Sequence, residues 1–322
     1  MRIEQGPPVF LAPMAGITDL PTRRLVRRFG VVGVVSEMVA SREMVTARPL
    51  ARMRSTLGLR DAGTAVQIAG CEAAPMAACA ALCADAGAAV IDINMGCPAK
   101  KVTNGLSGSA LMRDLDHALS LIQAVVAAVD VPVTLKTRLG WDDELKNAPE
   151  LARRAEAAGI QRIAIHGRTR CQFYKGRADW AAIAAVRDAV TIPVLANGDI
   201  VDVATARQAL AASGADGVMI GRGAQGRPWR PAEIAAAIWG APAPIVPAGS
   251  ALIDLIAGHY QDMLGFYGRD LGLRCARKHL GWYLDDLAPL PEVRHALLTA
   301  GSPETVLALL ADLPNRTEMA AA

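Results

Sequence analysis

Over roughly its first 230 residues the chain alternates short apolar runs with alanine-rich segments of helical character, such as 149–158 and 202–213. Each apolar run ends at a glycine, a proline or a polar residue, as buried strands do. The predicted strands lie at 9–16, 34–38, 65–70, 90–94, 133–140, 162–168, 194–199 and 217–222. About eight strands alternating with helices predict an α/β fold, the (β/α)8 TIM barrel, because an open doubly wound sheet usually stops at about five or six strands.

A proline- and glycine-rich segment, 240–250, follows the last predicted strand and has the composition of a linker. The residues beyond it have helical periodicity and a different texture. The predicted helices there lie at 251–267, 273–286, 292–299 and 303–312. We therefore predict two domains, a barrel spanning 1–240 and a small helical domain spanning 241–322.

Polar residues recur where the predicted strands end. In a barrel the C-terminal ends of all strands meet at one rim, and the active site is built there. The residues at these positions are Gln67, Asn94, Lys136, Arg138, His166, Asn197, Asp199 and Arg222. One such residue could be a satisfied buried polar group, but a whole ring of them predicts a site.

Cys97 lies on the same rim, on a loop directly after a strand, and Lys100 and Lys101 follow it closely. The loop position of Cys97 and the positive charge of the two lysines favour a catalytic role for the thiol. The alternative is a buried cysteine that serves as a small hydrophobic residue. A thiol is mostly protonated at neutral pH and can act as a general acid, although the lysines favour the thiolate. A cysteine–histidine hydrolase is disfavoured, because the rim histidine, His166, is expected on another part of the barrel.

The last two strand ends carry the features of a phosphate site. Residues 197–199 (NGD) and 221–222 (GR) supply glycines for close backbone approach, N–H donors and an arginine, and these two loops are the usual phosphate cradle of a barrel. Residues 221–226 also spell GxGxxG. A Rossmann site is not expected, because no βαβ unit follows.

A phosphate-bearing cofactor is therefore predicted, and FMN gives the other rim residues sensible roles. Lys136 could hold positive charge near the reduced ring, and Gln67 could bind the pyrimidine edge. Met14 and Ala15 could lie against a ring face.

Bulk composition excludes several classes. The 322-residue chain is 52% hydrophobic and 20% charged, and no apolar run approaches a membrane span. The N-terminus lacks a signal pattern, so a cytoplasmic protein is expected. The six cysteines do not form a disulfide framework, and Cys79 and Cys83 lack the partners of a metal site, so no metal is expected. A formal net charge of +3 does not by itself indicate a nucleic-acid binder.

The motifs that carry these residues occur together across the chain. They are APMAGITD (12–19), QIAG (67–70), DINMGCP (92–98), KTRLGW (136–141), HGRTR (166–170), NGD (197–199), GR (221–222) and ARKHLGWY (276–283). As a set they resemble the tRNA-dihydrouridine synthases, flavoenzymes that reduce uridines in tRNA. AKKV (99–102) and GRPW (226–229) are most similar to the bacterial B-type subgroup.

The resemblance implies that NADPH reduces bound FMN, that hydride passes to C6 of a D-loop uridine, and that Cys97 is the catalytic residue that protonates C5. It implies cofactor-binding roles for Pro13, Met14, Ala15, Gln67, Lys136, His166, Asn197, Gly198, Asp199, Gly221 and Arg222. It implies substrate-binding roles for Asn94, Lys100, Arg138, Arg168, Arg170, Arg274, Arg277 and Lys278. A monomer is expected.

Basic residues beyond the rim take on a purpose under this resemblance. Arg168 and Arg170 begin one cluster, and Arg274, Arg277 and Lys278 share a helix face by their spacing. We expect both groups to grip tRNA phosphates, the alternative for the second being a solvated helix face. Two other functions stay open, a small-molecule FMN barrel of the dihydroorotate-dehydrogenase or ene-reductase kind and an RNA-binding protein without turnover.

Overall fold

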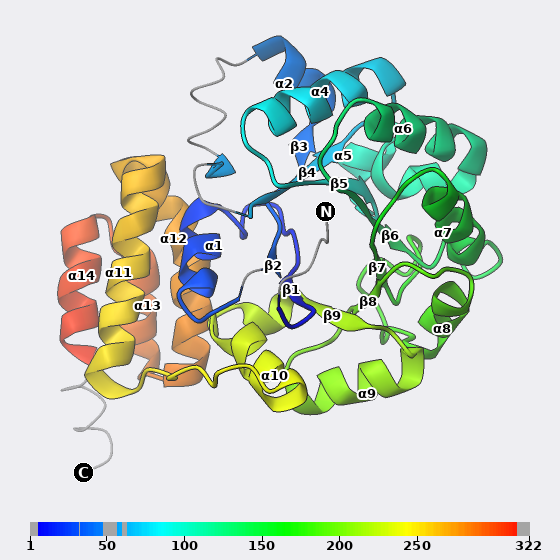
Figure 1. Cartoon of the computed structure of the whole chain (residues 1–322). Coiled ribbons are helices and arrows are strands. Elements are labelled where there is room, and N and C mark those ends of the chain that lie inside the picture. Colours follow the sequence, from blue (N-terminus) through cyan, green and yellow to red (C-terminus); the bar gives the residue numbers. More distant parts are fainter. Residues whose placement is uncertain (1–5, 32, 48–56, 60–62, 314–322) are drawn as a thin grey trace.

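The computed structural model describes residues 6–31, 33–47, 57–59 and 63–313. Its strands form a single parallel sheet in the order β2-β1-β9-β8-β7-β6-β5-β4-β3. The strands are β1 (Val9–Leu11), β2 (Gly33–Val34), β3 (Val39–Ala40), β4 (Ala65–Ala69), β5 (Val90–Met95), β6 (Val133–Arg138), β7 (Ile163–His166), β8 (Val194–Asn197) and β9 (Gly217–Ile220). Figure 1 shows this sheet curled into a barrel with helices around it.

The second predicted strand, 34–38, is a strand only at its start, because β2 ends at Val34 and β3 begins one residue beyond the predicted range, at Val39. Val35 forms a parallel bridge with Ala65, and the N–H of Ser36 donates to the Ala65 carbonyl at 2.9 Å. Residues that continue β2 therefore join the start of β4, while β3 pairs with the other end of β4. The barrel closes through this broken strand, and the predicted (β/α)8 fold is confirmed.

Helices follow the strands along the chain and cover the outside of the barrel (Figure 1). They are α1 (Leu20–Arg27), α2 (Ser41–Ala47), α4 (Ala73–Asp85), α6 (Leu115–Ala127), α7 (Ala148–Ala157), α8 (Ala181–Asp188), α9 (Val203–Ser213) and α10 (Arg230–Trp239), with the short elements α5 (Lys100–Thr103), η1 (Gly108–Arg113) and η2 (Arg222–Ala224). α1 begins with a cap, because the Asp19 carboxylate accepts the Thr22 N–H at 2.9 Å and Pro21 lies in the first turn.

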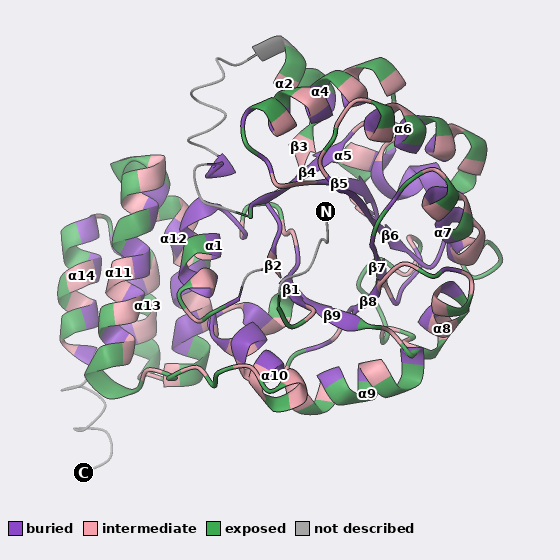
Figure 2. Ribbon diagram, in the orientation of Figure 1, coloured by how far each residue is buried: buried purple, intermediate pink, exposed green. Residues whose placement is uncertain are grey.

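Alternation along the strands separates two environments. Ile91, Ile93 and Met95 of β5 belong to the large apolar cluster between strands and helices, and Figure 2 shows buried residues on the helix faces that meet the strands. Asp92 and Asn94, at the intervening positions, point the other way, into the barrel. The period of two thus directs the polar residues of β5 to the inside.

The C-terminal helices are α11 (Gly249–Tyr267), α12 (Arg269–Leu287), α13 (Pro291–Thr299) and α14 (Pro303–Ala311). They contain an apolar cluster of their own and lie beside α1 (Figure 1). Tyr267 donates to Asp19 at 2.9 Å, and Thr22 lies 3.3 Å from His259. The predicted helices are present with slightly different ends. Of the predicted C-terminal domain, residues 314–322 lie outside the described part.

None of the helices in the described part is long and apolar enough to cross a membrane.

Candidate active site

Neighbouring strands align the polar side chains inside the barrel. The register of β4, β5 and β6 places Gln67 opposite Asp92 and Asn94 opposite Lys136. The Gln67 amide donates to Asp92 Oδ2 at 2.7 Å and accepts from Asn94 Nδ2 at 2.7 Å. Thr134 donates to the other Asp92 oxygen at 2.5 Å. All of these side chains are buried, so each hydrogen bond is shielded from water.

The loop after β5 holds Cys97 by its backbone. Asn94 Oδ1 accepts the N–H groups of Gly96 (3.2 Å) and Cys97 (3.0 Å). The Cys97 carbonyl accepts the N–H of Ser109 at 3.1 Å and its hydroxyl at 2.8 Å. Gly108 has a φ of +61°, and a Cβ there would lie 2.9 Å from the Cys97 oxygen. Cys97 is partly buried, and its position on the rim is fixed from both sides.

Lys136 lies at the centre of the rim and is 9% exposed. Its Nζ donates to Asn197 Oδ1 at 3.0 Å, and Asn197 in turn donates to the Met219 carbonyl at 2.7 Å. Burial, with the nearby charge of Arg138, lowers the pKa of Lys136 to about 8. Because this side chain connects β6 to β8, it links the Cys97 side of the rim to the predicted phosphate side.

Arg138 is buried, and its guanidinium binds backbone carbonyls. Nε donates to Gly96 at 2.8 Å, and one terminal nitrogen donates to Thr169 at 2.8 Å and Phe173 at 2.9 Å. Burial lowers its pKa to about 10. Arg138 is predicted from the sequence to bind substrate; in the structure it ties the loop after β5 to the loop after β7.

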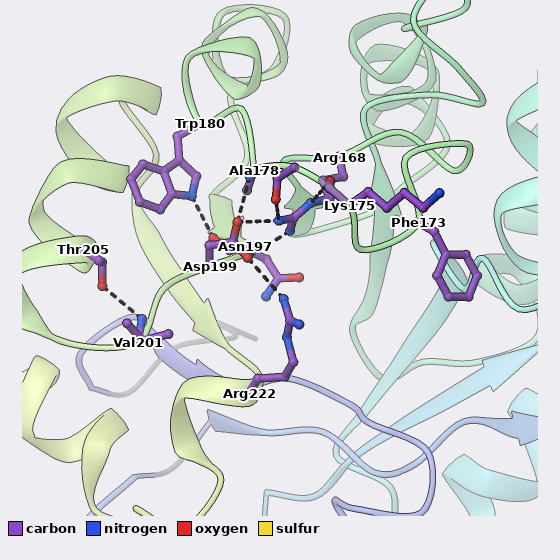
Figure 3. Close-up of polar contacts among 12 residues, drawn as sticks. Arg168, Phe173, Lys175, Ala178, Trp180, Asn197, Asp199, Val201, Thr205 and Arg222 are labelled. Carbon is purple, nitrogen blue, oxygen red and sulfur yellow. Dashed lines mark hydrogen bonds and ion pairs between the residues drawn. The ribbon is translucent and has the colours of Figure 1, made fainter.

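Arg168 is also buried, and it forms a bidentate ion pair with Asp199, at 2.9 and 2.6 Å (Figure 3). The same guanidinium donates to the carbonyls of Lys175 (3.1 Å) and Gly176 (2.7 Å). Burial raises the pKa of Asp199, but hydrogen bonds from Arg168 and the Ala178 N–H outweigh this and hold it below the usual value. Arg168 is predicted from the sequence to bind substrate and Asp199 to bind the cofactor. In the structure their ion pair joins the loop after β7 to the loop after β8.

His166, at the end of β7, has a buried Nδ1 with no hydrogen-bond partner among the described residues. Burial lowers its pKa well below the usual value, and the surrounding positive charges lower it further. Those charges belong to Lys136, Arg138, Arg168 and Arg222. A neutral imidazole with a free nitrogen inside a ring of cations is suited to an anionic group.

Two residues close to His166 along the rim, Gly198 and Gly221, have no side chain. Gly198 has a φ of +109°, and a Cβ there would lie 3.2 Å from His166 Cε1. Gly221 lies next to the end of β1, where a Cβ would be 3.6 Å from the Met14 sulfur. Arg222 keeps 56% of its side chain exposed and lies 3.2 Å from Asp199 (Figure 3). The predicted cofactor residues of β7, β8, β9 and β1 therefore lie side by side around the rim.

The first loop of the barrel completes this group. Pro13 and Met14 are partly buried and Ala15 is exposed. The Met14 N–H donates to Thr18 Oγ1 at 2.8 Å. Glu37, which is not among the predicted site residues, accepts the Gly16 N–H, and burial raises its pKa. The signal that could have found Glu37 is its place as a polar residue near the end of the predicted strand 34–38, but its partner, Gly16, lies on another loop.

The predicted RNA-contacting cations differ widely in burial. Lys100, Arg274 and Lys278 are exposed. Arg170 is partly buried and lies over the Trp141 ring at 4.7 Å. Arg277 donates to the Ala300 carbonyl at 3.3 Å and does not share the exposed face of its neighbours.

Lys278 brings α12 to the rim. A Cβ on Gly16 would lie 3.1 Å from Lys278 Nζ, so this ammonium lies at the loop after β1. The opposite end of the barrel contains a cavity of about 720 Å³ lined by Phe10, Phe29 and other residues at strand starts. That cavity is remote from the ring of polar strand ends, so its size does not identify the site.

Comparison with known proteins agrees with this geometry. The model of the dihydrouridine synthase family matches residues 10–317. A probable tRNA-dihydrouridine synthase of Rhodobacter capsulatus is 63% identical over 306 residues, which cover 94% of each chain. The chain belongs to the dihydrouridine synthase family.

Further relatives place it near one subgroup. The tRNA-dihydrouridine synthase B of Xanthomonas campestris pv. campestris is 48% identical, over 95% of this chain and 92% of the relative. A solved histamine dehydrogenase from Rhizobium sp. 4-9 covers 81% of this chain and 50% of its own, with 13% identity and a TM-score of 0.55, and is similar in fold.

Proposed function

We propose that this protein reduces a D-loop uridine of tRNA to dihydrouridine, with FMN bound in the barrel and NADPH as the reductant. Membership of the dihydrouridine synthase family supports the substrate class. The observation that carries the proposal is the position of Cys97, whose backbone is fixed by Asn94 and Ser109 on the rim that also contains Lys136 and His166.

The residues present fit the phosphate end of FMN. The buried Nδ1 of His166 lacks a partner among the described residues, and Gly198 and Gly221 carry no side chain that would separate a ligand from the backbone. Arg222 is exposed enough to bind a phosphate oxygen, while Asp199 and Arg168 hold its loop in place. We assign the phosphate to His166, Gly198, Gly221 and Arg222.

Lys136 would face the ring of the cofactor. A charged ammonium with a pKa of about 8 is available near neutral pH and stabilises negative charge that gathers nearby. Gln67 has one N–H left for the pyrimidine edge, because its other N–H and its oxygen bind Asp92 and Asn94. Pro13, Met14 and Ala15 would cover one face.

FMN held by these residues would supply, after reduction by NADPH, the hydride for C6 of uracil. Cys97 donates its thiol proton to C5, so the C5–C6 double bond becomes single and the thiolate regains a proton from water. One N–H of the Asn94 amide donates to Gln67, and the amide oxygen accepts the Cys97 N–H. The second N–H of Asn94 is left to orient the uracil. Cys97 and Asn94 would thus hold the proton donor next to the uracil that it protonates.

The target base must leave its stack to enter the barrel, which favours a loosely stacked loop. Lys100, Arg170, Arg274 and Lys278 would bind the surrounding phosphates. Arg138 and Arg168 act by holding the rim loops that the RNA would meet. We further propose that residues 1–240 and 241–322 form a catalytic and an RNA-binding domain, and that the protein is a cytoplasmic monomer.

The test is dihydrouridine content after incubation of purified protein with unmodified tRNA, FMN and NADPH. We expect dihydrouridine with the wild type and a loss of about 100-fold or more with Cys97→Ala. Cys171→Ala, which removes an exposed cysteine, is the matched control and should leave the rate unchanged. Flavin oxidation by a small unsaturated substrate, with none by tRNA, would overturn the assignment.

A further inference from the structure

The barrel interior contains a chain of hydrogen bonds that ends at the Cys97 loop. It runs from Thr134 to Asp92, then through the Gln67 and Asn94 amides to the N–H groups of Gly96 and Cys97. Asp92 belongs to a sequence motif but has no role in the proposed reaction. Yet Asp92 is two residues before Asn94, and the period of a strand puts both on one face.

The two ends of this chain fix its direction. An ionised carboxylate only accepts hydrogen bonds, so Gln67 must turn its NH₂ toward Asp92 and its oxygen toward Asn94. Asn94 must then turn its NH₂ toward Gln67 and its oxygen toward the backbone N–H groups, which only donate. Each amide therefore has one orientation that satisfies both neighbours.

We propose that Asp92 is a positioning residue that sets the direction of these hydrogen bonds and thereby holds Cys97 in place to donate its proton. The proposal rests on the proposed function for the proton transfer. The orientation itself depends only on the contacts described. Both Asp92 oxygens are engaged within the protein, by Thr134 and Gln67, so Asp92 acts through Gln67 and Asn94.

The direction of the chain does not depend on the charge of Asp92. Burial raises the pKa of the Asp92 carboxyl, although hydrogen bonds from Thr134 and Gln67 and the charges of Arg162 and Lys136 oppose that rise. When the carboxyl is protonated, its O–H can donate to Thr134 Oγ1, because a hydroxyl both donates and accepts, and the other oxygen still accepts from Gln67.

Paired substitutions at positions 92 and 67 separate the effect of hydrogen-bond direction from the effect of side-chain volume. Asp92→Asn keeps the shape and lets either end of the new amide face Gln67, so the direction of the Gln67 and Asn94 amides is then held from the Cys97 end alone. Gln67→Glu places a second acceptor against Asp92. The double variant restores the pattern, because the new amide at position 92 would then donate to the new carboxylate at position 67, which also accepts from Asn94. Ser213→Ala is the control, a change at a buried polar residue of α9 whose hydroxyl donates to the Ala209 carbonyl and takes no part in this chain of hydrogen bonds.

The readout is the rate at which iodoacetamide alkylates Cys97 in protein without cofactor, measured by peptide mass spectrometry against the exposed Cys171 of the same chain. We expect Asp92→Asn to release the loop and raise the relative rate about threefold or more, and Gln67→Glu to do the same. The double variant should return to within about twofold of the wild type, as should Ser213→Ala. Protection of the Cys97 amide in hydrogen exchange should fall and recover in parallel.

Two results would overturn the proposal. One is an unchanged Cys97 in Asp92→Asn by both measurements. The other is a double variant whose effect equals the two single effects combined, because that would mean that Asp92 acts by charge or volume. Dihydrouridine formation should fall about tenfold in Asp92→Asn. If the wild type forms none, the proposed function fails, while alkylation and exchange still decide the role of Asp92.

Discussion

Two groups of cations surround the mouth of the barrel, and they differ in what their N–H groups contact. Lys136, Arg138 and Arg168 are buried, and their donors bind an amide, backbone carbonyls or Asp199. Arg274 and Lys278 on α12 are exposed. The sequence presents both groups alike, as positive residues near a site.

The difference teaches that burial decides which task a positive charge performs. A buried guanidinium must satisfy its donors within the fold, so it fixes loops and contributes a weakly screened field. An exposed ammonium keeps its donors for a partner, and salt screens its charge. The buried group thus shapes the site, and the exposed group is available to phosphates.

The largest expected effect tests the structural task of the buried group. Arg168→Ala removes the bidentate partner of Asp199 and the donor to the Lys175 and Gly176 carbonyls. We expect the free energy of unfolding to fall by about 3 kcal/mol in urea denaturation. Arg274→Ala, the exposed counterpart, should change it by about 0.5 kcal/mol or less. Equal losses in the two variants would contradict the distinction.

The second effect depends on pH. Lys136 has a pKa of about 8 in the folded protein against an ordinary value of 10.5. Its charged form is disfavoured on folding, so it costs stability below about pH 8, and the cost disappears as the pH rises toward 10.5. Lys136→Met should therefore stabilise the cofactor-free protein by about 1–3 kcal/mol at pH 7 while abolishing activity.

That gain should shrink steadily in denaturation curves recorded from about pH 7 to about pH 10. Lys278→Met is the control, because replacement of an exposed lysine should change the free energy of unfolding by about 0.5 kcal/mol or less. A gain that grows with pH would show that the sign is wrong.

The third effect tests whether the buried cations form an anion site around His166. FMN should bind more tightly than riboflavin, which lacks the phosphate, and His166→Ala should weaken FMN about tenfold with little effect on riboflavin. Fluorescence titration of cofactor-free protein measures both constants. Equal loss for the two flavins would place His166 away from the phosphate.

The smallest effect belongs to the exposed group. Replacing Arg274 and Lys278 together by alanine should weaken tRNA binding about 3–10-fold and lower the slope of log K against log salt by about 1–2. Arg269→Ala is the control on the same helix, because Arg269 is paired with Glu304. A filter-binding series in salt measures the slopes, and an unchanged slope in the double variant would remove α12 from the RNA surface.

The site could be predicted in its parts but not in its contacts. Every predicted strand is present, the second one only at its start, and residues at strand ends do meet on one rim. The roles of Arg138 and Arg168 could not be foreseen, because Arg138 binds carbonyls that are 31 to 42 residues away and Arg168 binds the Asp199 carboxylate, 31 residues away. Glu37 and the link from Asp92 to Cys97 depend on strand register in the same way.

Local patterns by themselves determined the order of strands and helices, the cap of α1 at Asp19, and the placement of Cys97 on a loop at a strand end. These follow from periodicity, turn residues and capping, which act over a few neighbouring positions. Tertiary structure alone decided which cations are buried, which nitrogen of His166 lacks a partner among the described residues, and which way the Gln67 and Asn94 amides point. The physical reason is that burial and hydrogen-bond satisfaction depend on groups that only the closed barrel brings together.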